Sequence, residues 1–198
     1  NNDMLRLYAV TDRHWTGEQT LYEQVRDVLM GGATCLQLRE KDLDEASFYE
    51  EAKNIKELCR LFDVPFIIND NVMLAKEIDA DGVHVGQDDM ACAKAREILG
   101  PDKIIGVSAH TIEEARIAKE QGADYLGVGA IFPTSSKDDA EVLGIERLKE
   151  MTETVDLPMV AIGGISYDNC LLLKDTGIDG IAVISALFGQ KNIKQATI

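Results

Sequence analysis

Polar and charged side chains gather at the end of one apolar run, Cys35–Arg39. If this run is a strand, its period of two places Gln37, Arg39 and Lys41 on one side, with leucines facing the other way. An amide and two cations at a strand end favour the wall of an anion-binding site. The alternative is that Arg39–Asp44 begins a solvated helix, because Glu, Lys and Arg are good helix formers. The local pattern leaves both interpretations open.

Carboxylates and further cations follow other predicted strands. Asp70 comes directly after the third of these strands, and Asp89 lies in the segment Gly86-Gln87-Asp88-Asp89 that follows the fourth. Two carboxylates on neighbouring strand ends suit Mg²⁺, which keeps several waters and completes its shell with substrate phosphate. Each aspartate alone is equally suited to capping the helix that follows it. Arg39, Lys41 and Lys137 would neutralise a polyphosphate, although Lys137 in isolation also fits a solvated loop.

A second anion site is indicated near the last two predicted strands. Gly163 and Gly164 follow the seventh strand, and Ser185 follows the eighth. Glycines let backbone N–H groups approach a phosphate closely, as barrels often do at this point. The same pair is also typical of a tight turn. His84, in the middle of a strand, is interpreted as an interior histidine with satisfied hydrogen bonds.

The elements that must position these residues alternate between short apolar runs and helical patterns. Eight strand-then-helix units recur at a spacing of roughly 25 residues, which favours parallel strands with crossover helices. The predicted strands are 6–11, 35–39, 65–69, 82–85, 104–108, 125–128, 159–162 and 180–184. The predicted helices are 21–30, 48–62, 72–78, 91–99, 112–121, 145–152 and 167–175, and a final helix starts at 193–198.

A repeated turn favours a closed barrel over an open sheet. Similar small-residue turns precede the even-numbered strands at 32–35, 80–83, 122–125 and 177–180, which suits a (β/α)₈ TIM barrel. A doubly wound sheet would need a glycine-rich phosphate turn after its first strand, and the sequence there is Asp12-Arg13-His14-Trp15. We therefore predict one TIM-barrel catalytic domain over residues 1–198, with its active site at the carboxyl ends of the strands.

Composition limits the partners and the compartment. With 198 residues, 45% of them hydrophobic and 28% charged, the chain is long enough for one well-packed core. Its formal charge of −15 argues against nucleic-acid binding, which needs a basic face. No apolar run is long enough to span a membrane, and no signal peptide is visible, so we expect a cytoplasmic protein. The cysteines sit in apolar patterns and are predicted to be buried free thiols: Cys35, Cys59, Cys92 and Cys170.

Several motifs together resemble the thiamine-phosphate synthase family over nearly the whole chain. They are Leu7–Arg13, Gln37–Lys41, Ile68–Asp70, Gly82–Met90, Gly106–Thr111, Gly122–Tyr125 and Gly127–Lys137. The resemblance implies a transferase of thiamine biosynthesis. Such an enzyme joins 4-amino-2-methyl-5-(hydroxymethyl)pyrimidine diphosphate to thiazole phosphate and releases pyrophosphate. It also implies a dissociative mechanism, in which a pyrimidine-stabilised carbocation forms before the thiazole nitrogen attacks.

The resemblance further implies a role for individual residues. The pyrimidine diphosphate would contact Gln37, Leu38, Arg39, Glu40, Lys41, Asn69, Ser108 and Lys137, of which Arg39, Lys41, Ser108 and Lys137 would be catalytic. The thiazole phosphate would contact Thr134, Ser135, Ser136, Gly164, Ile184 and Ser185. Asp70 and Asp89 would hold Mg²⁺. The implied partners are these small molecules, with no nucleic acid and no membrane, and a homo-oligomer is left open.

The sequence departs from the family pattern at two places. Ser136 stands where the family often has threonine, which keeps the hydroxyl, and the last helix is expected to be short.

Three alternatives to this interpretation remain. A thiazole tautomerase of the same fold should lack part of the diphosphate and metal set, and all of that set is present. A non-catalytic binding or regulatory barrel should have lost its charged residues too. A domain of a larger fused enzyme remains an alternative.

Overall fold

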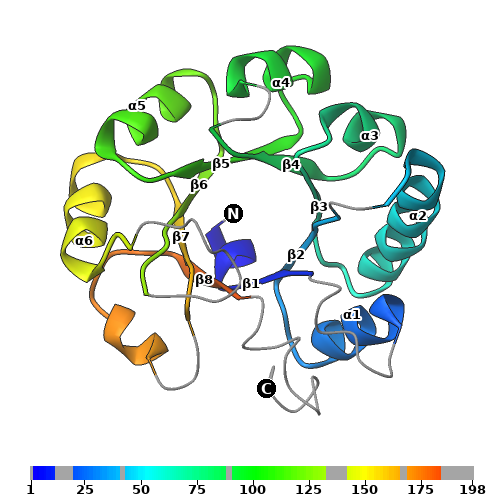
Figure 1. The fold of residues 1–198 in the computed structure, drawn as a ribbon, viewed down its shortest axis with the longest axis horizontal. Coiled ribbons are helices and arrows are strands. Elements are labelled where there is room, and N and C mark those ends of the chain that lie inside the picture. The colour runs from blue at the N-terminus through cyan, green and yellow to red at the C-terminus, as the bar shows by residue number, and fades with distance from the viewer. Residues whose placement is uncertain are drawn as a thin grey trace.

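The structure is a computed structural model that describes residues 2–11, 20–40, 43–87, 91–132, 142–165 and 169–183. Within these residues, eight parallel strands follow one another in sequence order and close into a barrel. The helices lie outside the ring of strands (Figure 1). The predicted TIM barrel is therefore confirmed, and the open doubly wound sheet is excluded.

The strands lie where the hydrophobic pattern predicts them, each end within one residue. Each strand has apolar residues on both faces, as expected for a parallel sheet buried between a packed interior and covering helices. The strands are β1 Leu7–Val10, β2 Cys35–Leu38, β3 Phe66–Asn69, β4 Gly82–Val85, β5 Ile104–Ala109, β6 Tyr125–Val128, β7 Met159–Ile162 and β8 Gly180–Val183.

The helices also follow the predicted order. They are α1 Leu21–Met30, α2 Glu45–Leu61, α3 Val72–Glu77, α4 Cys92–Leu99, α5 Ile112–Glu120 and α6 Ile145–Thr154, with 3₁₀ helices η1 Asn2–Leu5 and η3 Cys170–Leu173. Helix α2 begins before its predicted start at Phe48 because Asp44 caps it. The Asp44 carboxylate accepts a hydrogen bond from the backbone N–H of Ser47 at 2.7 Å.

The predicted helix at 167–175 is not found in the part of it that the structure describes. Residues 169–175 contain only the single 3₁₀ turn η3. Leu173 is buried, but Leu171 is 79% exposed and Leu172 is 59% exposed. One buried leucine offers too little apolar surface to hold a longer helix against the barrel. The predicted final helix at 193–198 lies outside the described residues.

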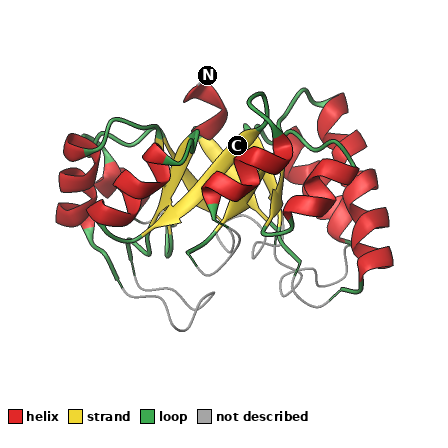
Figure 2. Cartoon of the chain, turned by 90° about the horizontal axis from the view of Figure 1, so that it is seen from above, coloured by secondary structure: helices red, strands yellow, loops and turns green. Residues whose placement is uncertain are grey.

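Two hydrophobic clusters separate the outside of the barrel from its interior. The larger cluster packs the helices against the outward faces of the strands. The smaller one fills the interior with Leu5, Tyr8, Val10, Cys35, Ile67, Tyr125, Val160 and Ala182. Helix η1, which supplies Leu5, lies over the end of the barrel where the strands begin (Figure 2). Leu5 therefore belongs to the packing at the end where the strands begin.

The cysteine prediction is confirmed in part. None of the four cysteines forms a disulfide in the described residues, and Cys35, Cys59 and Cys92 are buried. Burial raises the pKa of Cys59 to about 12, so this thiol stays protonated and unreactive. Cys170 is only half-buried, because it lies on the exposed turn η3. No helix in the described part of the chain has the length and apolarity needed to span a bilayer.

The repeated turns form a hydrogen-bonded bracket where the strands begin. In each turn, one residue donates its backbone N–H to a carbonyl near the start of the preceding odd-numbered strand. Its side-chain oxygen accepts the N–H of that same strand residue, at 2.8 to 2.9 Å. The pairs are Thr34 with Leu7, Asp81 with Phe66, Asp124 with Ile105, and Asp179 with Met159. The sequence repeat is therefore also a structural repeat.

Replacing Asp124 by alanine is expected to lower the free energy of unfolding by about 1–2 kcal/mol. The substitution leaves the N–H of Ile105 without its acceptor and removes the carboxylate that lies 2.6 Å from Arg96. Urea denaturation measures the loss. Asp124→Asn keeps one acceptor oxygen and should cost less. Asp156→Ala, at an exposed position before β7, is the control. Equal stability of the Asp124→Ala and Asp156→Ala variants would contradict a stabilising role for the bracket.

Candidate functional site

A cavity of about 100 Å³ lies inside the barrel. Each of the eight strands contributes at least one residue to its wall, and Arg39, which directly follows β2, contributes as well. For comparison, a buried cavity of about 150 Å³ can hold benzene, so this cavity is somewhat smaller than that but of the same order as a single small ring. Its lining combines apolar side chains with convergent polar groups, which is typical of a small-molecule site. The lining residues are Tyr8, Val10, Gln37, Arg39, Asn69, His84, Ser108, Tyr125, Gly127, Val160, Ile162 and Ala182.

The period-two prediction for β2 is confirmed where it is described. Gln37 and Arg39 line the cavity, whereas Leu38 is fully buried in the outer cluster. The Leu38 side chain therefore faces away from the cavity, and only its backbone remains available to a ligand. The alternative of a helix starting at Arg39 is wrong, because Arg39 and Glu40 are not helical and α2 begins at Glu45.

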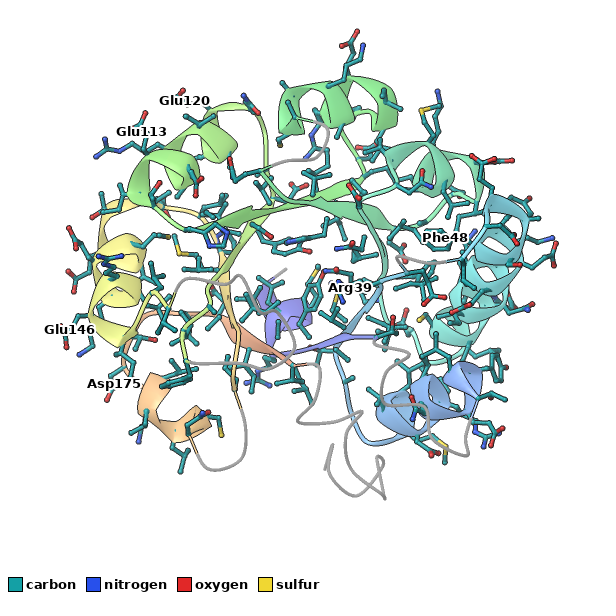
Figure 3. All side chains as sticks on the ribbon, viewed as in Figure 1. Arg39, Phe48, Glu113, Glu120, Glu146 and Asp175 are labelled. Atoms are coloured by element: carbon teal, nitrogen blue, oxygen red, sulfur yellow. The ribbon has the colours of Figure 1, made fainter. Side chains whose placement is uncertain are left out.

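The backbone around Arg39 is anchored by the buried hydroxyl of Thr11. Thr11 Oγ1 accepts the N–H of Arg39 at 2.9 Å, and the Thr11 N–H donates to the carbonyl of Gln37 at 3.0 Å. Figure 3 shows Arg39 within the ring of strands, whereas Glu113 and Glu146 lie on the outer helices α5 and α6. The acidic net charge therefore does not describe the cavity, where a guanidinium is held.

A continuous chain of hydrogen bonds crosses the barrel interior and links six strands. Most of its members are buried, and the chain ends at the cavity-lining hydroxyl of Ser108. The chain starts at Asn69, whose Nδ2 donates to Gln37 Oε1 at 2.7 Å, and Gln37 Nε2 donates to the Tyr8 hydroxyl at 2.9 Å. The Tyr8 hydroxyl is hydrogen-bonded to the Tyr125 hydroxyl at 2.5 Å. His84 then joins Tyr125 to Ser108: its Nδ1 lies 3.0 Å from the Tyr125 hydroxyl and its Nε2 lies 2.9 Å from Ser108 Oγ.

The two tyrosines of the hydrogen-bond chain stay neutral, and its histidine is hydrogen-bonded at both ring nitrogens. Burial raises the pKa of Tyr8 and the pKa of Tyr125 well above the ordinary phenol value, so both hydroxyls keep their hydrogens. His84 has a partner for each ring nitrogen. The interpretation of His84 as a satisfied interior histidine is thus confirmed, and the structure adds that it lines the cavity.

Tyr8 and Tyr125 are site residues that the sequence analysis missed. Their signal was glycine inside strands, which often marks a close approach by a bulky group. A Cβ on Gly106 would lie 2.1 Å from Cζ of Tyr125, and a Cβ on Gly127 would lie 3.1 Å from Cε1 of His84. Gly106 and Gly127 therefore make room for the two rings, and their positions in β5 and β6 could have pointed to interior aromatic groups.

Asp70 does not cap the helix that follows it. The N-cap of α3 is Asn71, whose side chain accepts the N–H of Leu74 at 3.0 Å. Asp70 is half-buried, has a φ of 73° and donates its N–H to the carbonyl of His84 at 2.8 Å. A left-handed backbone at a non-glycine residue is uncommon and is often found at functional sites. The capping interpretation is therefore wrong for Asp70, and its metal role stays a prediction.

Gly163 and Gly164 both have left-handed backbone conformations, with φ values of 101° and 69°. A Cβ on Gly163 would lie 2.6 Å from Cα of Ala130, so Gly163 is needed for close packing of the two backbones. The carbonyl of Gly164 accepts a hydrogen bond from Asn169 Nδ2 at 2.7 Å. The tight-turn interpretation accounts for Gly163, and contact between Gly164 and a phosphate stays a prediction.

Comparison with known proteins identifies the family of this chain. The family model described as thiamine monophosphate synthase matches residues 7–187. The chain belongs to the thiamine monophosphate synthase family. The thiamine-phosphate synthase of Clostridium tetani is 50% identical over 190 residues, which is 96% of this chain and 91% of that protein. That of Methanobrevibacter smithii is 47% identical over 197 residues, covering 100% and 94% of the two chains.

Among solved structures, thiamine phosphate pyrophosphorylase from Pyrococcus furiosus has a TM-score of 0.91 and 45% identity. The match covers 99% of this chain and 93% of that one. The thiamine monophosphate synthase family assignment thus extends over the whole barrel.

The described residues contain seven members of the set that the family resemblance implies for the diphosphate and the metal, including Leu38, whose side chain faces away from the cavity. Gln37, Arg39, Asn69 and Ser108 line the cavity, whereas Glu40 does not. Asp70 follows β3 directly. In the described part of the chain, three or more His, Cys, Asp or Glu side chains do not come together as metal ligands. The remaining implied residues lie outside the described ranges: Lys41, Asp89, Thr134, Ser135, Ser136, Lys137, Ile184 and Ser185.

Proposed function

We propose that this protein is a thiamine-phosphate synthase. It condenses 4-amino-2-methyl-5-(hydroxymethyl)pyrimidine diphosphate with thiazole phosphate, and it releases pyrophosphate. The observation that carries the proposal is the ring-sized cavity lined by Gln37, Asn69, Ser108 and Arg39. These are the residue types that would bind a heteroaromatic ring bearing an anionic group: two amides, a hydroxyl and a guanidinium.

In this proposal the pyrimidine ring enters the cavity and its diphosphate faces Arg39. Gln37 and Asn69 are already joined by a 2.7 Å hydrogen bond, so they are held in place before the ring arrives. Such prior ordering reduces the entropy lost on binding. Arg39 binds the diphosphate as a fork, and Lys41 and Lys137 add point charges. Together these cations stabilise the negative charge that develops on the leaving pyrophosphate.

The proposed Mg²⁺ ligands are Asp70 and Asp89. The carboxylate of Asp70 is half-buried and is not used to cap α3, so it suits a hard cation. When bound, Mg²⁺ would neutralise diphosphate charge and help the leaving group depart. The chain itself supplies Arg39 to the same group from the neighbouring strand end. This combination would allow an acidic protein to hold a polyanion.

The proposed mechanism is dissociative. Pyrophosphate leaves first, the pyrimidine stabilises the resulting carbocation, and the thiazole nitrogen attacks it. The walls of the cavity include Val160, Ile162 and Ala182, which limit the access of water to the cation. The proposed thiazole phosphate contacts are Thr134, Ser135, Ser136, Gly164, Ile184 and Ser185.

We also propose that residues 1–198 act as one catalytic barrel domain in the cytoplasm. Three buried cysteines without disulfides in the described residues suit a reducing compartment. The proposed partners are the two small-molecule substrates.

The test is incubation with both substrates and Mg²⁺, followed by measurement of pyrophosphate and thiamine phosphate. A synthase should release equal amounts of the two products, and release should require the thiazole phosphate. Reactions without each substrate, and with EDTA, are the controls. Isomerisation of the thiazole without pyrophosphate would indicate a tautomerase instead. Binding of substrates without any product would indicate a non-catalytic barrel.

A further inference from the structure

The hydrogen-bond chain in the barrel has a direction, because each hydroxyl carries one hydrogen. Gln37 Nε2 donates to the Tyr8 hydroxyl, so the hydrogen of Tyr8 must point elsewhere. Tyr8 is 1% exposed, and its other side-chain partner in the described chain is Tyr125. Tyr8 therefore donates to Tyr125. The Tyr125 hydrogen then points to Nδ1 of His84, 3.0 Å away.

This direction determines the tautomer of His84. Because Nδ1 accepts from Tyr125, the ring hydrogen lies on Nε2, which is 2.9 Å from Ser108 Oγ. Ser108 Oγ thus accepts a hydrogen bond from His84. The hydrogen of the Ser108 hydroxyl is left for an acceptor in the cavity that Ser108 lines.

The opposite direction is disfavoured by the orientation of one amide. It would place a hydrogen on Nδ1 of His84, so that Tyr125 donates to Tyr8. The hydrogen of Tyr8 would then face the donor Nε2 of Gln37 and have no acceptor, and buried unsatisfied donors are costly. Asn69 Nδ2 donates to Gln37 Oε1 at 2.7 Å, so the opposite direction would require the amides of both Gln37 and Asn69 to be reversed.

We propose that His84 is a positioning residue. As the neutral Nε2–H tautomer set by Gln37, Tyr8 and Tyr125, it makes Ser108 a hydrogen-bond donor to an acceptor atom of the bound substrate. This inference rests on the proposed function and deepens it, because it states which substrate atom the Ser108 hydroxyl recognises. That atom carries a lone pair and is a ring nitrogen or a diphosphate oxygen.

The tautomer is directly measurable by NMR. Protein labelled with ¹⁵N-histidine gives ring ¹H–¹⁵N correlations that distinguish a nitrogen bearing hydrogen from a bare one. The chain has three histidines, and the signals lost in a His84→Gln variant identify those of His84. We expect hydrogen on Nε2 and a bare Nδ1 at neutral pH. Hydrogen on Nδ1 alone, or on both nitrogens, would overturn the inference.

Two near-isosteric variants test whether the chain sets this tautomer. At mildly alkaline pH, Gln37→Glu supplies a carboxylate that can only accept, so Tyr8 must donate to it. The direction then reverses, and the His84 hydrogen should move to Nδ1. Tyr8→Phe removes one link and should produce a mixture of tautomers. Tyr22→Phe is the matched control, because Tyr22 is 42% exposed on α1 and lies outside the chain. Its His84 signals should equal those of the wild type.

Circular dichroism and thermal melting show whether each variant is folded. If Gln37→Glu does not fold, the milder Tyr8→Phe decides the question. A His84 spectrum that is unchanged in folded Tyr8→Phe would contradict control by the chain.

Kinetics then connect the tautomer to turnover. Groups that orient a metal-bound histidine commonly contribute about ten- to hundredfold, and we take the lower end for a histidine that only positions another side chain. We therefore expect Tyr8→Phe to lower kcat by about tenfold and to change KM for the diphosphate much less. An unchanged kcat would show that the tautomer does not matter for the reaction. The proposed function and the tautomer are tested by different results. If the wild-type protein releases no pyrophosphate but still shows the Nε2–H signal of His84, the synthase activity is contradicted and the tautomer assignment stands.

Discussion

Asp70→Asn is expected to reduce pyrophosphate release by on the order of 10²–10³-fold, the loss typical when one group that stabilises departing charge is removed. Asparagine has nearly the same shape and tolerates a left-handed backbone. The cap of α3 is also kept, because it belongs to Asn71. The fold should therefore persist. Binding of thiazole phosphate, measured by isothermal titration calorimetry, should stay within about twofold of the wild type because the proposed thiazole site lies elsewhere.

A matched control exists for this substitution. Asp63 also has a left-handed backbone, with a φ of 56°. It is exposed and lies between α2 and the start of β3, at the end of the barrel opposite to Asp70. Asp63→Asn should keep wild-type turnover. The metal proposal is contradicted if Asp70→Asn retains wild-type activity in EDTA-treated buffer. Loss of both activity and thiazole phosphate binding would indicate a misfolded site instead.

Gly106→Ala is expected to lower the free energy of unfolding by about 3 kcal/mol, at the upper end for overpacking a core. The new methyl group would lie 2.1 Å from Cζ of Tyr125. Tyr125 cannot move aside easily, because it is buried and bonded to both Tyr8 and His84. Displacing this ring would also break the interior hydrogen-bond chain, so turnover should fall with stability. Urea denaturation and pyrophosphate release measure the two effects.

Gly127→Ala provides the graded comparison. Its Cβ would lie 3.1 Å from Cε1 of His84, a contact that a shift of a few tenths of an ångström relieves. Its stability loss should therefore be clearly smaller than that of Gly106→Ala. Equal losses in the two variants, or a neutral Gly106→Ala, would show that the interior rings are free to rearrange. Such a result would also weaken the argument for a chain of fixed direction.

The distribution of charge explains how an acidic protein can serve an anionic substrate. Within the described residues, acidic side chains such as Glu113, Glu120 and Glu146 lie on the outer helices (Figure 3). Arg39 lines the interior cavity. Local placement, rather than the net charge of −15, decides what binds there.

The sequence by itself determined the barrel, the strand ends and the inward face of β2. These properties follow from short-range rules: apolar runs of strand length, a period of two, and helix caps. Gln37 and Arg39 could be placed inside because alternation along one strand needs no knowledge of its neighbours. Asn69 and Ser108 followed from their positions at strand ends, since parallel strands bring their carboxyl ends to one side of a barrel.

Only the tertiary structure decided which side chains meet. Tyr8 and Tyr125 are 117 positions apart, and their contact depends on barrel closure and on the space left by Gly106. The choice between Asp70 and Asn71 as the cap of α3 depended on a backbone angle that no residue pattern specifies. The helix expected at 167–175 followed a plausible apolar pattern, but the barrel surface there buries only Leu173 of its three leucines. Burial is a property of neighbours in space, so the local sequence could not reveal it.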